Sequence, residues 1–555
     1  ITTLSLGPHA IKFGTRVRDA RDARLTDSGF NGSFTFSNYQ DYLAMANGLQ
    51  SQSFNSLVAQ GYGPISANIT TGQQSALANV FDAALFAQDD WKLSSRLTLS
   101  GGLRWEAQNH IADHDDWGPR ASFAYALDGN GKDKKTKTVV RGGYGFFFDR
   151  FPVSNLLTIN FANIQNQVVL NQPTCGATAT TLSAIDLSSC TSNGGPASGN
   201  ATPVKYEVAP NFHASTTQQF GASLERQVLP GTSATLTFLR SFGVHQLVTR
   251  NANQATGGTP QTNSGGYLYE YYPEAVFKQN QLIASVNSKV NKNLSLVGFY
   301  TLSYANGNGN GSTSNAYDLD QDYGRAGFVN RNSVFFMASY TAPWGIRFNP
   351  FLIAQAGRPF NITLASDPLN NFYNQRPTFA TSSTPTADIV STRFGQLDSA
   401  ALSGETLIPA NLGTGPAAVA LNLRISRSFG IGPKLAAGTV QPDGGPPGGG
   451  GPPGGGGGGG GRGGGPPGGG LGPGGLGGGG GRGGPGGMFG PTGTGRKYSL
   501  NFSAQALNLF NDIDYGTPTG TLTSPYFDKS TTLAQGIFST GSAARRIFIQ
   551  AVFSF

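Results

Sequence analysis

The sequence predicts an all-β fold, a transmembrane antiparallel up-and-down β-barrel with long extracellular loops. One indication is the C-terminal segment, residues 545–555, in which apolar and polar side chains alternate. Its apolar face, which would contact lipid, consists of Ile547, Ile549, Ala551, Phe553 and Phe555. The opposite face suits a wet lumen, with Phe548 and Val552 as exceptions. A strand of a soluble sandwich could show the same local pattern, so the prediction needs support from the rest of the chain.

A second indication is that alternating segments of about ten residues recur along the whole chain. In residues 96–106, for example, Leu99 and Leu103 lie on one face, and Ser100 and Arg104 lie on the other. The composition agrees, because only 12% of the residues are charged and 11% are aromatic. Since no helical period supplies a cover for the apolar faces, bilayer lipid is the simpler cover.

Counting back from the C-terminus gives about 14 strands, with a further fragment at residues 2–6. The strands expected to run outwards are 9–21, 95–107, 137–150, 231–245, 293–306, 345–358 and 497–512. Those expected to run towards the periplasm are 81–93, 119–128, 214–228, 276–289, 332–342, 418–431 and 545–555.

The connections between these strands differ in length, and the difference orients the predicted barrel. Short links fall at residues 94–95, 229–231, 290–292 and 342–344, with a slightly longer one at 128–136. Much longer loops separate these hairpins. Barrels of this kind place short turns in the periplasm and long loops outside, so the long loops are expected to be extracellular.

Residues 432–496 interrupt the strands with a core that is almost entirely Gly and Pro. Such a composition cannot bury enough apolar surface to fold, so we expect a disordered insertion, on the periplasmic side. It divides the chain into barrel strands and loops at 1–431, the insertion, and the last two strands at 497–555. The insertion could be an inert turn or a contact with peptidoglycan or a partner. RNA binding is disfavoured, because only Arg462 and Arg482 interrupt its glycines.

The composition also excludes several classes of function. No apolar run is long enough for a transmembrane helix, and the net charge of +8 shows no basic face for nucleic acid. The five His are scattered, and no Ser or Cys lies in a nucleophile motif, so we expect a protein that is not an enzyme. Cys175 and Cys190 lie in one loop, which predicts a disulfide in an oxidising compartment.

Several segments carry a family resemblance. Residues 86–106 (FAQDDWKLSSRLTLSGGLRWE) resemble the mid-barrel hairpin of TonB-dependent outer-membrane receptors. Residues 507–511 (LNLFN) and 545–555 (RRIFIQAVFSF) resemble their last two strands. Segments similar to the Oar-like subgroup are 118–125 (GPRASFAY), 140–149 (VRGGYGFFFD), 223–226 (SLER), 322–324 (DYG) and 357–360 (GRPF). These matches occur in the family's order from about His9 to Phe555.

The resemblance implies a receptor of the bacterial outer membrane that binds a ligand at its extracellular loops. Passage would be driven by the TonB complex pulling on a plug domain. Family members carry an N-terminal regulatory-like domain, a TonB box, a plug and a 22-stranded barrel. We therefore expect this chain to be the C-terminal barrel portion, truncated or processed at Ile1 and without the plug.

Two alternatives to a receptor stay open. One is a complete passive porin of about 14 strands, and the other is a surface adhesin or structural barrel. The sequence does not identify the ligand, and ferric siderophores, oligosaccharides and peptides all fit the resemblance.

Three carboxylates at every second position, Asp318, Asp320 and Asp322, lie in a predicted extracellular loop. Hard oxygen ligands at this spacing can surround Ca²⁺, although the EF-hand pattern fails here. The alternative is a solvated loop whose acids pair with Arg325 and Arg331. We expect no cofactor, with calcium at this loop as the one candidate.

Two further sets of residues are candidates for ligand contact. The first comprises Tyr267, Tyr269, Tyr271 and Tyr272. They would form either an aromatic girdle at the outer interface or a surface that stacks on a sugar or peptide. The second set, Arg104 and Arg141, faces the predicted lumen, where it could attract an anion or, as the resemblance implies, meet the plug.

Overall fold

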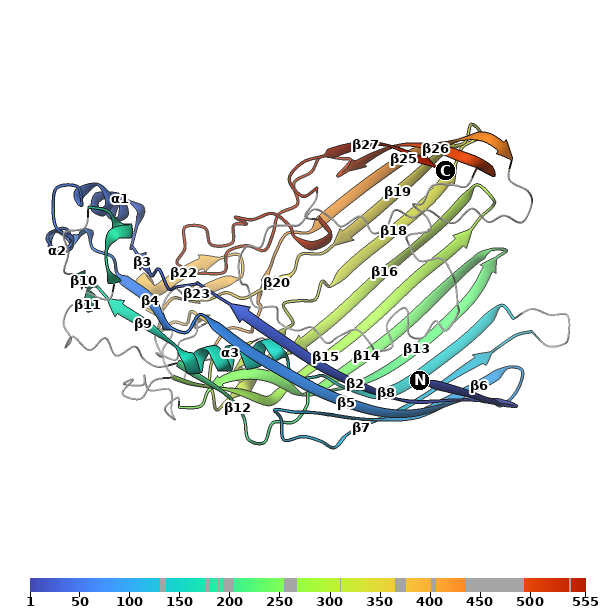
Figure 1. The fold of residues 1–555 in the computed structure, drawn as a ribbon, viewed down its shortest axis with the longest axis horizontal. Coiled ribbons are helices and arrows are strands. Elements are labelled where there is room, and N and C mark those ends of the chain that lie inside the picture. The colour runs from blue at the N-terminus through green and yellow to red at the C-terminus, as the bar shows by residue number, and fades with distance from the viewer. Residues whose placement is uncertain are drawn as a thin grey trace.

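The structure is a computed structural model. It describes residues 1–129, 136–175, 180–187, 190–192, 204–253, 267–309, 311–364, 376–400, 406–434, 494–538 and 541–555. A single curved sheet of 17 strands forms most of it (Figure 1). The predicted insertion lies almost entirely outside the described residues, so its state and location stay predictions.

Fourteen long strands of this sheet follow one another along the chain, each antiparallel to the next. They are β2 (His9–Leu25), β5 (Ser75–Lys92), β6 (Leu97–Gln108), β7 (Asp116–Ala126), β8 (Thr138–Phe148), β13 (Thr216–Leu229), β14 (Thr232–Asn251), β15 (Tyr267–Lys289), β16 (Leu294–Gly307), β18 (Asn332–Thr341), β19 (Ile346–Gln355), β25 (Ala418–Lys434), β26 (Arg496–Leu507) and β27 (Arg546–Ser554). The short strand β1 (Thr2–Leu6) pairs with β2. The predicted number of strands, their order and the N-terminal fragment are therefore confirmed.

Alternation along each strand separates a lipid face from a luminal face. On β5, the outward Phe81 and Leu85 are 46% and 51% exposed, whereas the inward Asp82 is 1% exposed. The neighbouring β6 is in register, with Leu85 opposite Trp105 on the outer face. Large exposed apolar side chains recur on the outer faces of the other strands. Because bilayer lipid can cover these side chains, the sheet does not need a second layer.

The strand connections are short at one end of the sheet and long at the other (Figure 1). Among the short ones, Gly231 has a φ of 73° in the β13–β14 turn, where a Cβ atom would approach the Lys289 carbonyl oxygen to 2.6 Å. Glycine therefore suits this tight turn. The predicted asymmetry of the connections is confirmed.

The long loops contain helices and small sheets that the alternation pattern did not predict. Their helices are α1 (Tyr39–Gly48), α2 (Phe54–Leu57) and α3 (Val153–Ile164), with a π-helix η1 (Val58–Tyr62) and 3-10 turns η2 (Leu182–Ala184), η4 (Leu319–Asp322), η5 (Thr386–Asp388) and η6 (Gly536–Phe538). Their strands are β3 (Ser33–Thr35), β4 (Ser66–Gly72), β9 (Gln165–Asn171), β10 (Pro173–Cys175), β11 (Cys190–Ser192), β12 (Val204–Val208), β17 (Gly324–Arg325), β20 (Pro359–Phe360), β21 (Thr378–Phe379), β22 (Ile389–Thr392), β23 (Gly395–Asp398) and β24 (Gly413–Thr414). No helix of the described residues has the length and apolar character needed to cross a membrane.

One group of these elements forms a separate packed unit at the end of the long loops. It combines α1, α2, β3, β4 and β9–β11 around an apolar cluster that includes Met45, Phe54 and Leu170. Cys175 and Cys190 belong to this cluster and form a disulfide that joins β10 to β11. The unit therefore ties together two loops that are far apart in the sequence.

The sheet has two free edges within the described part of the chain. The strand β27 pairs only with β26, and β1 pairs only with β2. In Figure 1 these two edges lie apart, with β27 at the top and β2 at the bottom. The described strands thus form a curved wall that does not close on itself.

Candidate functional site

At the extracellular end of the sheet, α3 packs against the inner face of the wall. Its Leu156 and Leu157 share one buried apolar cluster with Ala78 and Val80 of β5. These two β5 residues lie on the same face of the strand as Asp82, which is the luminal face. The helix therefore covers part of the luminal face of the wall at its extracellular end.

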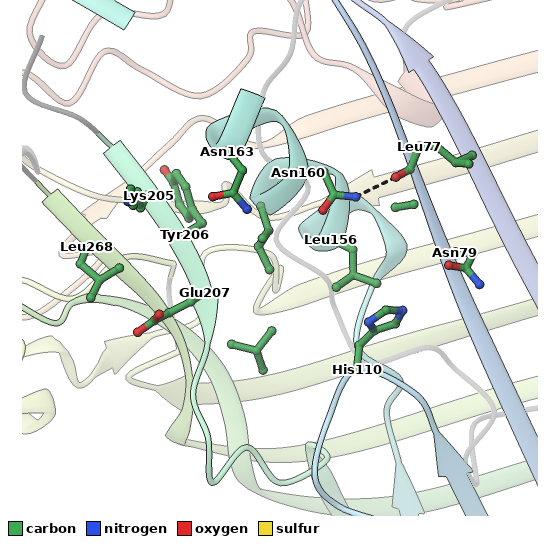
Figure 2. A pocket seen from close by; sticks show the side chains of 13 residues that line it. Leu77, Asn79, His110, Leu156, Asn160, Asn163, Lys205, Tyr206, Glu207 and Leu268 are labelled. Atoms are coloured by element: carbon green, nitrogen blue, oxygen red, sulfur yellow. Dashed lines mark hydrogen bonds between the residues drawn. The ribbon is translucent and has the colours of Figure 1, made fainter. Parts of the chain in front are cut away.

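A cavity of about 450 Å³ lies beside this helix (Figure 2). Figure 2 shows that α3 forms one wall of the cavity, with β12 on one side and the end of β5 on the other. The amides of Asn160 and Asn163 come from α3, and Ala78 of β5 lies on the strand face that α3 covers. Lys205 and Glu207 come from β12. The volume falls in the range of about 300–1,000 Å³ that is usual for small-molecule sites.

The position of β12 depends on an irregularity of the sheet. This strand runs parallel to β15, with Val204 opposite Tyr267 and Val208 opposite Tyr271. It occupies the edge of β15 that β16 leaves free beyond Phe277. A simple up-and-down topology does not contain such a pairing, and the sequence analysis missed it.

Below the cavity, a network of ion pairs crosses the luminal wall. Asp82 lies between two guanidinium groups, at 2.6 Å from Arg18 Nε and 2.7 Å from Arg150 Nε. Arg150 also reaches Glu106 at 3.4 Å, and Glu106 pairs with Arg104. These contacts link β2, β5 and β6 to the segment that leads into α3.

The arginines predicted to face the lumen do so, but each has an acidic partner. Arg104 pairs with Glu106, and Arg141 Nη1 lies 2.6 Å from Glu225 Oε2. The positive charge of both side chains is thus balanced locally. Their predicted role in ligand binding is untested and stays a prediction.

Two of the four candidate tyrosines, Tyr269 and Tyr271, do not belong to an accessible surface, and the side chain of Tyr267 lies outside the described part of the structure. Tyr269 and Tyr271 are only 1% and 7% exposed, and both rings pack against Tyr206 of β12. Tyr272 is half-buried, with the Arg250 guanidinium 3.4 Å from its ring centre. The expectation of a shared girdle or stacking surface is therefore wrong for Tyr269 and Tyr271, because the parallel strand β12 covers them.

The acidic loop is paired with an arginine other than those expected. Asp318 and Asp320 lie at the 3-10 turn η4, while Asp322 is buried and lies 2.7 Å from Arg376 Nη2. The predicted partner Arg325 instead donates to backbone carbonyl groups, and Arg331 donates to the Tyr304 hydroxyl. Burial raises the pKa of Asp322 in spite of its cation. Within the described residues no group of three metal-ligating side chains is arranged to hold an ion, and calcium binding stays a prediction.

Asp113 ties the β6–β7 loop to the segment before β13. Its Oδ2 accepts from the Ala214 backbone N–H at 3.0 Å and lies 3.2 Å from His213 Nδ1. Burial alone would raise the pKa of Asp113, but these hydrogen bonds and that from Asp115 outweigh it and lower the pKa. His110, three residues before Asp113, lines the cavity.

Asp149, which follows β8, provides a test of the electrostatics of this region. Burial, opposed by Arg150 and aided by Glu106, raises the pKa of Asp149 to about 6. The value in an unfolded chain is about 3.9. A raised carboxyl pKa means that the folded state loses stability as the pH rises through this window, because the unfolded chain ionises first.

We therefore expect Asp149→Asn to be more stable than the parent protein by about 1–2 kcal/mol above pH 6, after allowing for partial exposure. The difference should shrink as the pH falls towards 4. Urea unfolding of both proteins in lipid vesicles between pH 4 and 7 measures it. A pH-independent difference would mean that the carboxylate acts through packing and not through ionisation.

Comparison with known proteins decides the family. A family model described as an outer membrane beta barrel domain matches residues 1–116 and 111–436, more than half of the chain. The chain belongs to this family. As an outer membrane β-barrel domain, it resides in the outer membrane, and the predicted fold class and location are confirmed. No curated protein matches the sequence.

Solved structures with a similar fold include outer membrane proteins of known type. The outer membrane transporter YddB from Escherichia coli matches with a TM-score of 0.50 and 11% identity, over 100% of this chain and 52% of that chain. The ferric enterobactin receptor PfeA from Pseudomonas aeruginosa, in a mutant form, matches with a TM-score of 0.46 and 11% identity, over 99% and 52%. The siderophore receptor PirA from Acinetobacter baumannii matches with 0.44 and 10%, over 99% and 53%.

This outer membrane β-barrel domain thus spans about half the length of the solved structures that it matches. At 11% identity, the similarity to the transporter shows the fold and does not extend to a ligand. The similar fold is that of an outer membrane transporter.

Sequence reasoning missed most of the residues that line the cavity. Asn79, Asn160 and Asn163 carry no motif, since asparagine is common in loops and at wet strand faces. A signal did exist for Asp82, which is an acid between the small and apolar residues Ala78, Val80 and Ala84 on the inner face of β5. Its partner Arg150 follows the FFFD segment and could not be assigned without the fold.

Proposed function

We propose that this chain is the C-terminal barrel portion of a TonB-dependent outer-membrane receptor of the Oar-like subgroup. The observation that carries the proposal is the packing of α3 on the luminal face of β5 at the extracellular mouth. A passive pore needs an open mouth, whereas here α3 covers part of the luminal face at the end of the wall and lines a cavity. Ligand would bind at these loops before it enters the barrel.

The remaining parts of the proposal concern partners outside the described residues. A receptor of this class needs a plug domain and a TonB box, which couple the barrel to the TonB complex. The similarity to about half of a transporter structure supports a longer native protein in which further strands pair with β1 and β27. Catalysis forms no part of this proposal.

The proposal is tested on the native full-length protein. We expect it to bind the periplasmic domain of TonB in a pull-down and to remain closed to ions in a planar lipid bilayer. Steady conductance without TonB binding would overturn the receptor proposal and favour a passive porin. If the protein shows no conductance and no TonB binding but attaches to surfaces, an adhesin or structural barrel is favoured.

A further inference from the structure

The outer surface of the sheet changes from apolar to cationic across the neighbouring strands β14, β15 and β16. One transverse row of outward side chains, one from each strand, consists of Phe238, Leu282 and Leu302. The next row consists of Arg240, Asn280 and Tyr304. In the first row, Phe238 and Leu282 are 39% and 40% exposed, as side chains that contact lipid should be. The apolar surface therefore ends between these two rows.

The cationic row lies towards the end of the sheet that carries the long loops. The connection from β14 to β15 spans residues 252–266, and that from β16 to β18 spans residues 308–331. Barrels of this kind place their long loops outside the cell. On β16, Tyr304 follows Leu294 at the opposite end by ten residues, about the length that a strand needs to cross the bilayer. The row that contains Arg240 is therefore at the level of the lipid headgroups of the outer leaflet.

Lys278 adds a second cation beside Arg240. It lies in the next row outwards, opposite Phe242 of β14, and is thus a diagonal neighbour of Arg240. Such neighbours are about 7–8 Å apart, so two long side chains can reach one bound group. The Lys278 ammonium lies 5.9 Å from the ring centre of Phe242 and 6.0 Å from that of Tyr323. Attraction to these rings keeps the ammonium close to the sheet.

Arg331, in the segment before β18, supplies a third cation. Its Nη2 donates to the Tyr304 hydroxyl at 2.7 Å, and its guanidinium group lies 4.6 Å from the centre of the same ring. Tyr304 and Arg240 lie opposite Asn280 from its two neighbouring strands. The three cations thus surround one exposed amide at the end of the apolar surface.

The positive charge of this region is not balanced by acids. Within the described part of the chain, neither Arg240, Lys278 nor Arg331 forms an ion pair. Elsewhere on the outer face, Arg21 of β2 lies 2.8 Å from Asp19. Cations at the headgroup level attract anionic lipids, and clustered guanidinium groups suit phosphate oxygens in particular.

We propose that a cationic patch on the outer face of the sheet binds the phosphorylated headgroup of a lipid in the outer leaflet. The patch consists of Arg240, Lys278, Asn280 and Arg331. These side chains would donate to the phosphate oxygens, while the acyl chains would lie on the neighbouring apolar row. A lipid fits better than free phosphate because the patch borders that row directly. The inference goes beyond the proposed function and does not rest on it, since a porin or an adhesin would have the same outer face.

The test is native mass spectrometry of the full-length protein in a neutral detergent, titrated with diphosphoryl lipid A, phosphatidylcholine or inorganic phosphate. Diphosphoryl lipid A should bind at least about tenfold more tightly than phosphatidylcholine, whose phosphate is neutralised by its own choline group. The patch variant Arg240→Gln/Lys278→Gln should weaken this binding by about 25-fold, because each cation near an anionic lipid contributes about a factor of five. Both side chains are exposed, so the variant is expected to fold. The exchange variant Arg240→Lys/Lys278→Arg keeps both charges and should retain most of the affinity.

Lys137→Gln/Lys289→Gln is the matched control. Both lysines are exposed at the opposite end of the sheet, and neither forms an ion pair with a described residue. The control removes the same charge and should leave the affinity unchanged.

Three results would overturn the proposal. In the first, lipid A binds no more tightly than phosphatidylcholine, or the patch variant binds as well as the parent, as a merely solvated cationic surface would. In the second, the control or the exchange variant loses as much affinity as the patch variant, so that binding does not depend on charge at the patch. In the third, inorganic phosphate alone binds as tightly as lipid A, which would make the patch a site for a free anion.

Discussion

Replacing Asp82 by Asn is expected to lower the free energy of unfolding by about 2–3 kcal/mol. The Asp82 side chain is 1% exposed and neutralises both Arg18 and Arg150. Its removal leaves Arg18 without an acidic partner in the described part of the chain, and it leaves Arg150 with only the more distant Glu106, at 3.4 Å. The loss should be smaller than the ~3–5 kcal/mol of a fully buried pair, because Arg18 is 43% exposed and water can compensate in part. Urea unfolding in lipid vesicles measures the change.

The matched control is Asp19→Asn on the neighbouring strand β2. Asp19 lies 2.8 Å from Arg21, but the side chains are 36% and 73% exposed. Exposed pairs of this kind contribute up to about 1 kcal/mol. Equal losses in the two variants would show that burial of Asp82 between its arginines has no energetic consequence, contrary to the structure.

Replacing Arg376 by Met is expected to destabilise the extracellular loops by about 3–5 kcal/mol without affecting the strands. The Arg376 side chain is 2% exposed, contacts Asp322 at 2.7 Å and donates to the Gln321 carbonyl oxygen at 2.6 Å. Without it, the Asp322 carboxylate is buried with only the Ser314 hydrogen bonds at 2.6 and 2.7 Å. Since burial already raises the pKa of Asp322, the loss of its cation should raise it further.

Hydrogen exchange resolves this local effect. Amide protection should fall in residues 311–325 and persist in β16 and β18. Arg393→Met is the control, because the ion pair of Arg393 with Asp528, also at 2.7 Å, is 55% exposed on the arginine side. It should cost less than about 1 kcal/mol. Unchanged protection in the Arg376 variant would mean that other contacts hold this loop.

The strands could be predicted because their information is local. A period of two over about ten residues shows where a strand lies and which face meets lipid. Each strand also pairs with its neighbour along the chain, so the order in the sheet follows from the sequence directly. The expected segment 95–107 and the observed β6 (Leu97–Gln108), for example, differ by one or two residues at each end.

The loops could not be predicted in this way, because their partners are distant in the sequence. Arg376 lies 54 positions from Asp322, and the nearer Arg325 bonds to backbone groups instead. Asp113 bonds to Ala214, 101 positions away. Many polar and charged residues lie at such separations along the chain. Their charge and spacing alone do not show which of them bond to each other.

The sequence by itself therefore determined the membrane-spanning wall, the short and long connections at its two ends and its wet inner face. Only the tertiary structure decided that β12 covers Tyr269 and Tyr271 and that α3 packs on Ala78 and Val80 of β5. The physical reason is the range of the interactions. Lipid acts on every outward side chain in the same way and leaves a periodic pattern, whereas the loops are held by individual contacts between distant segments, which leave no pattern in the sequence.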